Sequence, residues 1–261
     1  MTKRYPDNRI PIYLQIRKRA RQIVARFPLP DFYKDFSRFD ELSRQLFEST
    51  STLAELLIYV KQNIDDDFGH GLQHSVKVAI DAGTLMLIEG GQIGYSEKFT
   101  ERRVLIAQCA GLLHDIKRKQ KSHSVKGADY ARKLLKGYEF QPGEIEDICK
   151  AIHNHEAFLT DTAEINTRRG ALVSDCLYDA DKFRWGPDNF TDTVWDMVLF
   201  YNPPLIKFMD GYPKGMESLV KIKSTFRTNT GKQYGPQFID IGLAIGEKLY
   251  EVIKKEFAQY L

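Results

Sequence analysis

Apolar side chains recur at helical spacing along most of this chain. From Ile12 to Phe27 they return every third or fourth residue, the pattern of one apolar face on an amphipathic helix. The same spacing marks the segments 52–63, 71–89, 100–115, 123–136, 143–155, 168–183 and 238–257. Because no segment alternates apolar and polar residues as a half-buried strand does, the sequence predicts an all-α protein of about ten helices.

The chain is expected to form one all-α domain over residues 1–261. Its length and its 43% apolar content suffice for a sizeable core, and no low-complexity linker divides it. Residues 202–204, Asn-Pro-Pro, are expected to break a helix without marking a domain boundary. The Gly- and Thr-rich segment 227–236 is predicted to be a long loop, lying either on the surface or over a pocket.

The sequence carries no sign of membrane insertion or secretion. No segment has the roughly 18–20 consecutive apolar residues needed to cross a bilayer. The N-terminal residues 1–9 are polar and lack the apolar stretch of a signal peptide, which favours a cytoplasmic protein. Cys109, Cys149 and Cys176 lie far apart among apolar residues, so we expect buried thiols and no disulfide framework.

The positive charge of the chain is concentrated at one end. Residues 1–26 carry eight basic side chains and one acidic, a local charge of +7, whereas the whole chain has a net charge of +3. An amphipathic helix over 12–27 that docks on the core with its charges in water explains this simply. Binding of nucleic acid or of a membrane surface is an alternative for the same helix.

All six histidines lie between residues 70 and 155. His114 and Asp115 follow the apolar segment 104–113, which delivers a polar pair at the end of a buried helix. A buried aspartate needs a compensating charge, and a metal ion supplies one. Together with His74 and Asp181 from two other helices, this pair predicts a mixed nitrogen and oxygen site. Such a site suits a divalent ion of Mn, Fe, Co, Ni or Zn.

These residues resemble the HD superfamily of metal-dependent phosphohydrolases. The resemblance covers roughly residues 65–185 and rests on the order of His74, the His114-Asp115 doublet and Asp181, the last within Ala-Asp-Lys-Phe. It implies an all-α HD core over 65–185 with N-terminal helices. A helical extension over 186–261 is expected to cover the pocket. It also implies His74, His114, Asp115 and Asp181 as metal ligands, with Asp179 a less favoured substitute for Asp181.

The other histidines are candidates for a second metal or for a substrate phosphate. His123 begins a segment that resembles a downstream block of several HD subfamilies, and His153 or His155 matches a further position. Because two residues that are two apart on a helix point in different directions, only one of His153 and His155 is expected to face the site. His70 is a further candidate, and each of the four has a structural hydrogen bond as its alternative. One or two ions per chain are therefore expected.

A divalent ion lowers the pKa of bound water toward about 7, which favours hydrolysis of a phosphoester. Asp115 is the candidate proton acceptor, with help from Asp65, Asp66 or Asp67, and Lys117 is a second catalytic candidate. Four cations beside the ligand positions are candidate phosphate contacts: Lys77, Lys117, Arg118 and Lys182. The sequence after Asp115 is Ile-Lys where many family members have Ile-Gly-Lys, so the substrate side of the site is less defined. Gly211-Tyr212-Pro213 is interpreted as a turn, and it implies no cyclic dinucleotide hydrolysis.

The resemblance therefore favours a phosphohydrolase or phosphodiesterase whose substrate is a small phosphorylated molecule, such as a nucleotide. Aromatic residues after the core are candidates to line its pocket: Trp185, Phe190, Trp195, Phe200 and Tyr201. A binding module that has lost catalysis and an HD-type nuclease are the alternatives. The sequence predicts neither the substrate nor the oligomeric state, and a nucleic-acid substrate is the less favoured choice.

Overall fold

The computed structural model describes residues 9–64 and 71–261. This part of the chain is all-α and contains no strand. Its α-helices are α1 (Arg9–Val24), α2 (Asp31–Asp35), α3 (Ser37–Ser49), α4 (Ser51–Asn63), α5 (Leu72–Gln92), α6 (Glu97–Leu113), α7 (His123–Leu134), α8 (Pro142–His153), α9 (Arg168–Phe183), α10 (Val194–Tyr201), α11 (Leu205–Ile222) and α12 (Asn229–Glu256). A π-helical turn, η3 (Asn189–Thr193), precedes α10, and short 3₁₀ turns follow α7 and α12.

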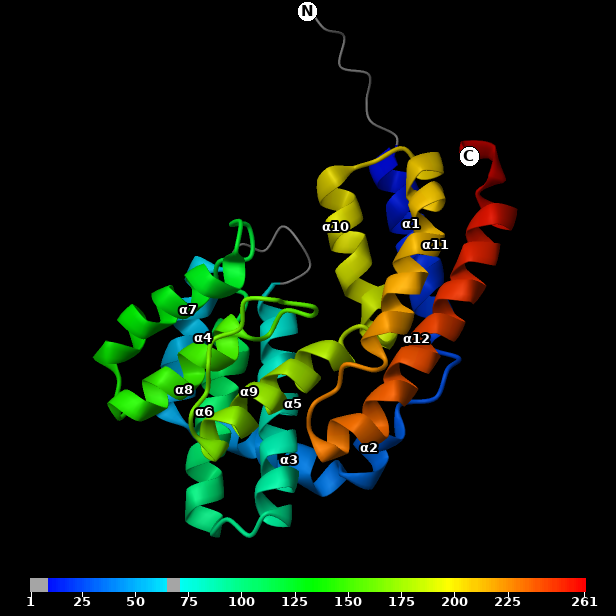
Figure 1. Ribbon diagram of the computed structural model, residues 1–261. Coiled ribbons are helices and arrows are strands. Elements are labelled where there is room, and N and C mark those ends of the chain that lie inside the picture. The colour runs from blue at the N-terminus through cyan, green and yellow to red at the C-terminus, as the bar shows by residue number, and fades with distance from the viewer. Residues whose placement is uncertain (1–8, 65–70) are drawn as a thin grey trace, which may run out of the picture.

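Helix α5 is the centre of the larger group of helices, α3 to α9 (Figure 1). It packs against α6, α9 and α3, and nearly every residue from His74 to Gly90 is buried. This burial explains why α5 has apolar residues on all sides rather than a single stripe. Its first turn carries His74 and its neighbour α6 ends at His114, so the packing of these two helices sets the distance between two predicted ligands.

The N-terminal helix α1 packs with the C-terminal helices and not with the group around α5. Figure 1 shows α1 beside α10, α11 and α12, although almost the whole chain separates α1 from α12. The hydroxyl of Tyr13 donates to the carbonyl of Pro203, and Arg19 pairs with Glu256. The basic helix therefore docks on the C-terminal extension, with charged side chains on its outer side.

Three phenylalanines join the two groups of helices. Phe183, at the end of α9, stacks on Phe238 of α12 with ring centroids 4.1 Å apart. Phe32 of α2 lies 5.0 Å from Phe183, and all three rings are buried. Because Phe183 follows Asp181 by two residues, this cluster fixes the end of α9 that carries a predicted ligand. The division of the chain into a core of 65–185 and an extension of 186–261 stays a prediction.

Two predictions about local structure were wrong. Residues 229–236 form the start of α12 rather than a loop, since Thr228 caps the helix through the N–H of Gly231 and the carboxylate of Asp179 accepts bonds from residues 227 and 228. Residues 211–213 lie within α11 rather than in a turn, and the hydroxyl of Tyr212 there donates to the carbonyl of Gly246. In both segments, tertiary contacts outweigh the low helix propensity of Gly and Pro.

The expected break at residues 202–204 is present. Asn202 ends α10 in the left-handed conformation, with a φ of 44°, and α11 begins directly after Pro204. No helix in the described part of the chain combines the length and the apolar character that crossing a bilayer requires.

Gly111 sets how closely α5 and α6 approach each other. A Cβ at this position would lie 2.5 Å from the Cα of Ala79 and 2.7 Å from its backbone nitrogen. We expect Gly111→Ala to lower the free energy of unfolding by about 1–3 kcal/mol, because backbone atoms must move to admit the methyl group. Urea denaturation followed by circular dichroism measures this change.

Gly91 provides the matched control, since it lies on α5 and a Cβ there meets nothing within 4 Å. Gly91→Ala is expected to leave stability unchanged or to raise it by up to about 1 kcal/mol. Equal effects of the two substitutions would show that the contact between α5 and α6 does not limit stability.

Candidate metal centre

His114 and Asp115 lie at the end of a buried helix, as the sequence predicts. Helix α6 ends at Leu113, and the side chains of His114 and Asp115 are 0% and 2% exposed. The ring Nδ1 of His114 lies 2.7 Å from the carbonyl oxygen of Gly111. A carbonyl only accepts, so Nδ1 carries the proton and the lone pair of Nε2 points to the opposite side.

Nε2 of His114 faces ligand candidates from two other helices. It lies 3.2 Å from Nε2 of His74 and 3.7 Å from Oδ1 of Asp181. His74 comes from the first turn of α5 and Asp181 from the last turns of α9, and their own atoms are 3.3 Å apart. These three buried residues present one ligand atom each within a space that a metal ion fits.

A second group of residues, His114, Asp115 and His155, shares His114 with the first. Oδ2 of Asp115 lies 3.5 Å from Nε2 of His114, whereas Oδ1 lies 3.5 Å from Nε2 of His155 and 3.4 Å from Nε2 of His123. His155 is held like His114, with Nδ1 2.6 Å from the carbonyl oxygen of Ile152. Its buried Nε2 makes no hydrogen bond within the described part of the chain. Asp115 therefore lies between two positions, and the residues around each position could hold a metal ion.

Burial and neighbouring charges determine the protonation states of the centre. Burial lowers the pKa of His114 to about 4, so its imidazole is neutral at pH 7. Burial opposes ionisation of Asp181, but the ammonium of Lys182 beside it holds the pKa of that carboxyl well below its usual value. Burial likewise opposes ionisation of Asp115, and neighbouring imidazoles and Arg118 keep its pKa low. Neutral imidazoles and charged carboxylates form a donor set that fits a divalent metal ion.

The remaining predicted histidines differ in position. His123 and His155 line the cavity beside the centre, which has a volume of about 310 Å³. His153 points elsewhere, with Nε2 3.1 Å from the carbonyl oxygen of Asp161, so His155 is the one of the pair that faces the site. His70 lies outside the described residues, as do Asp65, Asp66 and Asp67.

The four predicted phosphate contacts lie in different surroundings in the structure. Arg118 and Lys182 line the cavity beside the centre, and Lys182 is bonded to Asp181. Lys117 lies outside this lining, because its ammonium sits 3.8 Å from the centre of the Tyr130 ring. We therefore leave Lys117 out of the candidate catalytic and phosphate-binding groups.

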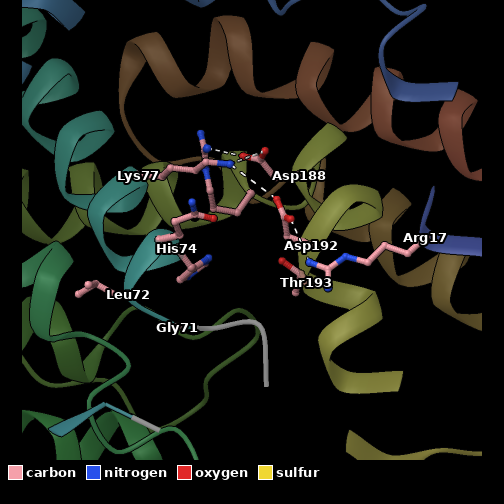
Figure 2. A pocket seen from close by; sticks show the side chains of 10 residues that line it. Arg17, Gly71, Leu72, His74, Lys77, Asp188, Asp192 and Thr193 are labelled. Carbon is pink, nitrogen blue, oxygen red and sulfur yellow. Dashed lines mark hydrogen bonds and ion pairs between the residues drawn. The ribbon is translucent and has the colours of Figure 1, made fainter. Parts of the chain in front are cut away.

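Lys77 lies in a second, adjoining cavity of about 340 Å³ that shares His74 and Arg184 with the first. Figure 2 shows Lys77 directed at Asp188, to which it is bonded at 3.0 Å, and Arg17 of α1 directed at Asp192. The positive charge of Lys77 is thus already partly balanced. A substrate phosphate would have to compete with Asp188 for it.

Several residues at the centre were not predicted. Glu156 lies 3.5 Å from Nδ1 of His123, and its position directly after His155 was a usable signal. Arg184 is buried between both cavities and pairs with Asp81 and Asp188. Arg17 reaches the second cavity from α1, and no local pattern connects it with Asp192.

The candidate aromatic residues whose side chains are described lie in four environments. Trp185 lines the cavity beside the centre, and Phe190 lines an apolar groove next to it. Trp195 is fully buried in the core, and Tyr201 is 70% exposed. The side chain of Phe200 lies outside the described part of the structure.

Asp179 makes structural contacts and does not face the centre as Asp181 does. Its carboxylate accepts bonds from the backbone N–H groups of Arg227 and Thr228 and from the Thr228 hydroxyl. These bonds attach the start of α12 to α9, and Asp179 belongs to neither group of candidate ligands. Burial raises its pKa to about 6.

The segment that carries the candidate ligands matches a known family model. The family model of the HD domain matches residues 71–185 of the chain. Among solved structures, the chain is similar to the crystal structure of a predicted HD superfamily hydrolase from an uncultured Thermotogales bacterium. That match has 23% sequence identity and a TM-score of 0.43, and it covers 83% of this chain and 94% of the other. No curated protein sequence matches the chain significantly.

Substitution of the two neighbouring aspartates separates a structural role from a ligand role. We expect Asp179→Ala to lower the free energy of unfolding by about 2–4 kcal/mol, because three buried donors lose their acceptor. We expect Asp181→Ala to lower the bound metal per chain instead. Elemental analysis and urea denaturation of both variants test this assignment, and equal metal loss in both would contradict it.

The depressed pKa of His114 predicts a pH dependence of stability in the metal-free protein. The folded pKa of about 4 lies below the ordinary value of 6.5, so the folded chain binds fewer protons between these pH values. The contribution to stability is present above about pH 6.5 and is lost as the pH falls through about 4, amounting to roughly 3 kcal/mol.

Urea denaturation from pH 4 to 7 measures this effect. His114→Gln should flatten the dependence, whereas His153→Gln, at a partly exposed histidine, should leave the slope as it is in the wild type. A slope that His114→Gln leaves unchanged would contradict the assignment.

Proposed function

We propose that this chain is a metal-dependent hydrolase that cleaves a phosphate ester of a small molecule. The observation that carries the proposal is the convergence of imidazole Nε2 atoms and carboxylate oxygens from the ends of α5, α6, α8 and α9 on the His114-Asp115 pair. The match of residues 71–185 to the HD domain model supports the same class of reaction. We infer one or two divalent ions of Mn, Fe, Co, Ni or Zn, held by His74, His114, Asp115 and Asp181 and, for a second ion, by His123, His155 and Glu156.

A divalent ion held by these residues would supply a water of lowered pKa and a positive charge for the phosphoryl oxygens. The backbone carbonyls of Gly111 and Ile152 keep the Nδ1 protons of His114 and His155, so that both Nε2 lone pairs face the centre. Asp115 is the proposed proton acceptor. Arg118, with its guanidinium 3.6 Å from Oδ1 of Asp115, is the proposed contact of a substrate phosphate, and Lys182 holds Asp181 in place.

A nuclease is the weaker alternative. Arg17 and Arg21 of the basic helix pair with Asp192, and Arg19 pairs with Glu256. These contacts use part of the positive charge within the chain itself, which favours docking of α1 over binding of nucleic acid. A module that binds metal without catalysis is the other alternative, and only an activity measurement distinguishes it.

Measurement of hydrolysis tests the proposal directly. The protein, loaded with Mn²⁺, Co²⁺ or Ni²⁺, is supplied with p-nitrophenyl phosphate, bis-p-nitrophenyl phosphate and nucleoside monophosphates. We expect turnover of at least one class and a loss of about 100-fold or more in Asp181→Asn, because a ligand is lost. His153→Ala, a histidine outside the centre, is the matched control and should stay within about twofold of the wild type. A metal-loaded protein inactive on all three classes would favour the binding module.

A further inference from the structure

An apolar groove adjoins the cavity beside the metal centre. It has a volume of about 400 Å³ and is lined by residues of η3, α10 and α11, which are located in Figure 1. Its walls are mainly hydrocarbon and include Phe190, Val194, Phe208 and Leu219. Among the side chains that line it, Lys207 is the one charged group. A groove of this kind removes apolar atoms of a ligand from water, whereas the metal centre binds charge.

The groove and the metal cavity adjoin each other. Trp185, Asn189 and Met197 line both of them. The far side of the metal cavity carries His74, Asp115 and Asp181. A molecule with a charged end and an apolar end therefore fits both parts at once, with Trp185 and Met197 beside its middle. Because the groove adjoins the metal cavity, we take its occupant to be part of the substrate rather than a separate protein.

Helix α11 contributes two residues without side chains to the wall of the groove. Gly211 and Gly215 lie one turn apart and both line it, and a Cβ added to either meets nothing within 4 Å. Each glycine costs helix stability relative to alanine, and no neighbouring atom in the described structure requires its small size. What the two glycines do provide is open space along the groove.

We propose that this groove binds the apolar portion of the substrate, so that the substrate is a phosphate ester of an alkyl or aryl group. The proposal rests on the hydrolase function proposed above and adds the class of group that the ester carries. Each methylene group that leaves water strengthens binding by up to about fourfold. A hexyl ester is therefore expected to exceed an ethyl ester by about tenfold or more, since part of the chain remains exposed.

The test compares hexyl phosphate with ethyl phosphate in the Mn²⁺-loaded protein. We expect kcat/KM for the hexyl ester to be at least about tenfold higher. Gly215→Leu places a side chain in the groove and should reduce this ratio to within about threefold, with little change for ethyl phosphate. Lys214→Leu adds the same side chain to α11 outside the groove and should keep the wild-type ratio. Gly211→Leu serves as a second blocking variant, and circular dichroism verifies that each variant is folded.

A binding measurement separates failure of the groove from failure of the proposed hydrolase. Hexylphosphonate and ethylphosphonate have no ester bond to hydrolyse, and calorimetry measures their affinities. Tighter binding of hexylphosphonate that Gly215→Leu removes supports the groove even when no ester is hydrolysed. Equal affinities and equal kcat/KM values for both chain lengths overturn the groove and leave the hydrolase standing.

A second copy of the chain is the remaining alternative occupant of the groove. Analytical sedimentation of the wild type and of Gly215→Leu tests this alternative. An assembly that dissociates in Gly215→Leu, combined with no effect of chain length on binding, would assign the groove to a protein interface. That result would overturn the proposal.

Discussion

The buried carboxylate of Asp115 is the constraint on which the centre depends. It is 2% exposed and lies within 3.6 Å of groups from four other residues: His114, Arg118, His123 and His155. Three of these neighbours are imidazoles. The Nδ1 atoms of His114 and His155 bond to backbone carbonyls, and Nδ1 of His123 lies near Glu156, so their Nε2 atoms present lone pairs to Asp115. Arg118 supplies one positive charge 3.6 Å from Oδ1, and a second cation would further offset the cost of burying this carboxylate. The surroundings of Asp115 are thus suited to a positive ion.

The helices around Asp115 are fixed by contacts that have no ligand role. Gly111 lets α6 approach the backbone of α5 at Ala79, and the Phe183–Phe238 stack fixes the end of α9. Asp179 attaches α9 to α12 by accepting three hydrogen bonds. Because the candidate ligands come from the ends of these helices, small changes in helix packing alter the distances at the centre. The geometry of the site is therefore a property of the packing, as is usual for preorganised metal sites.

Helical periodicity was sufficient to predict the all-α class and most helices, because the buried faces of these helices follow a regular spacing. The four residues His74, His114, Asp115 and Asp181 were grouped from the sequence, and the structure brings them together. The start of α12 and the helical course of residues 211–213 were not predicted, since contacts of Thr228 and Tyr212 with distant residues override local propensity. Arg17 at Asp192 and Lys117 on Tyr130 likewise depend on neighbours far along the chain.

The two halves of the site come from different parts of the sequence. The candidate ligands all lie within residues 71–185, the part that the HD domain model matches. The groove lies almost wholly in the segment from 189 to 219, beyond that match, and α1 docks against the same helices through Tyr13 and Arg17. Because the candidate ligands and the groove occupy separate segments, each can be altered by substitution without removing a residue of the other. We therefore infer that the reaction class follows from α5 to α9, whereas the group attached to the phosphate is selected by α10 and α11.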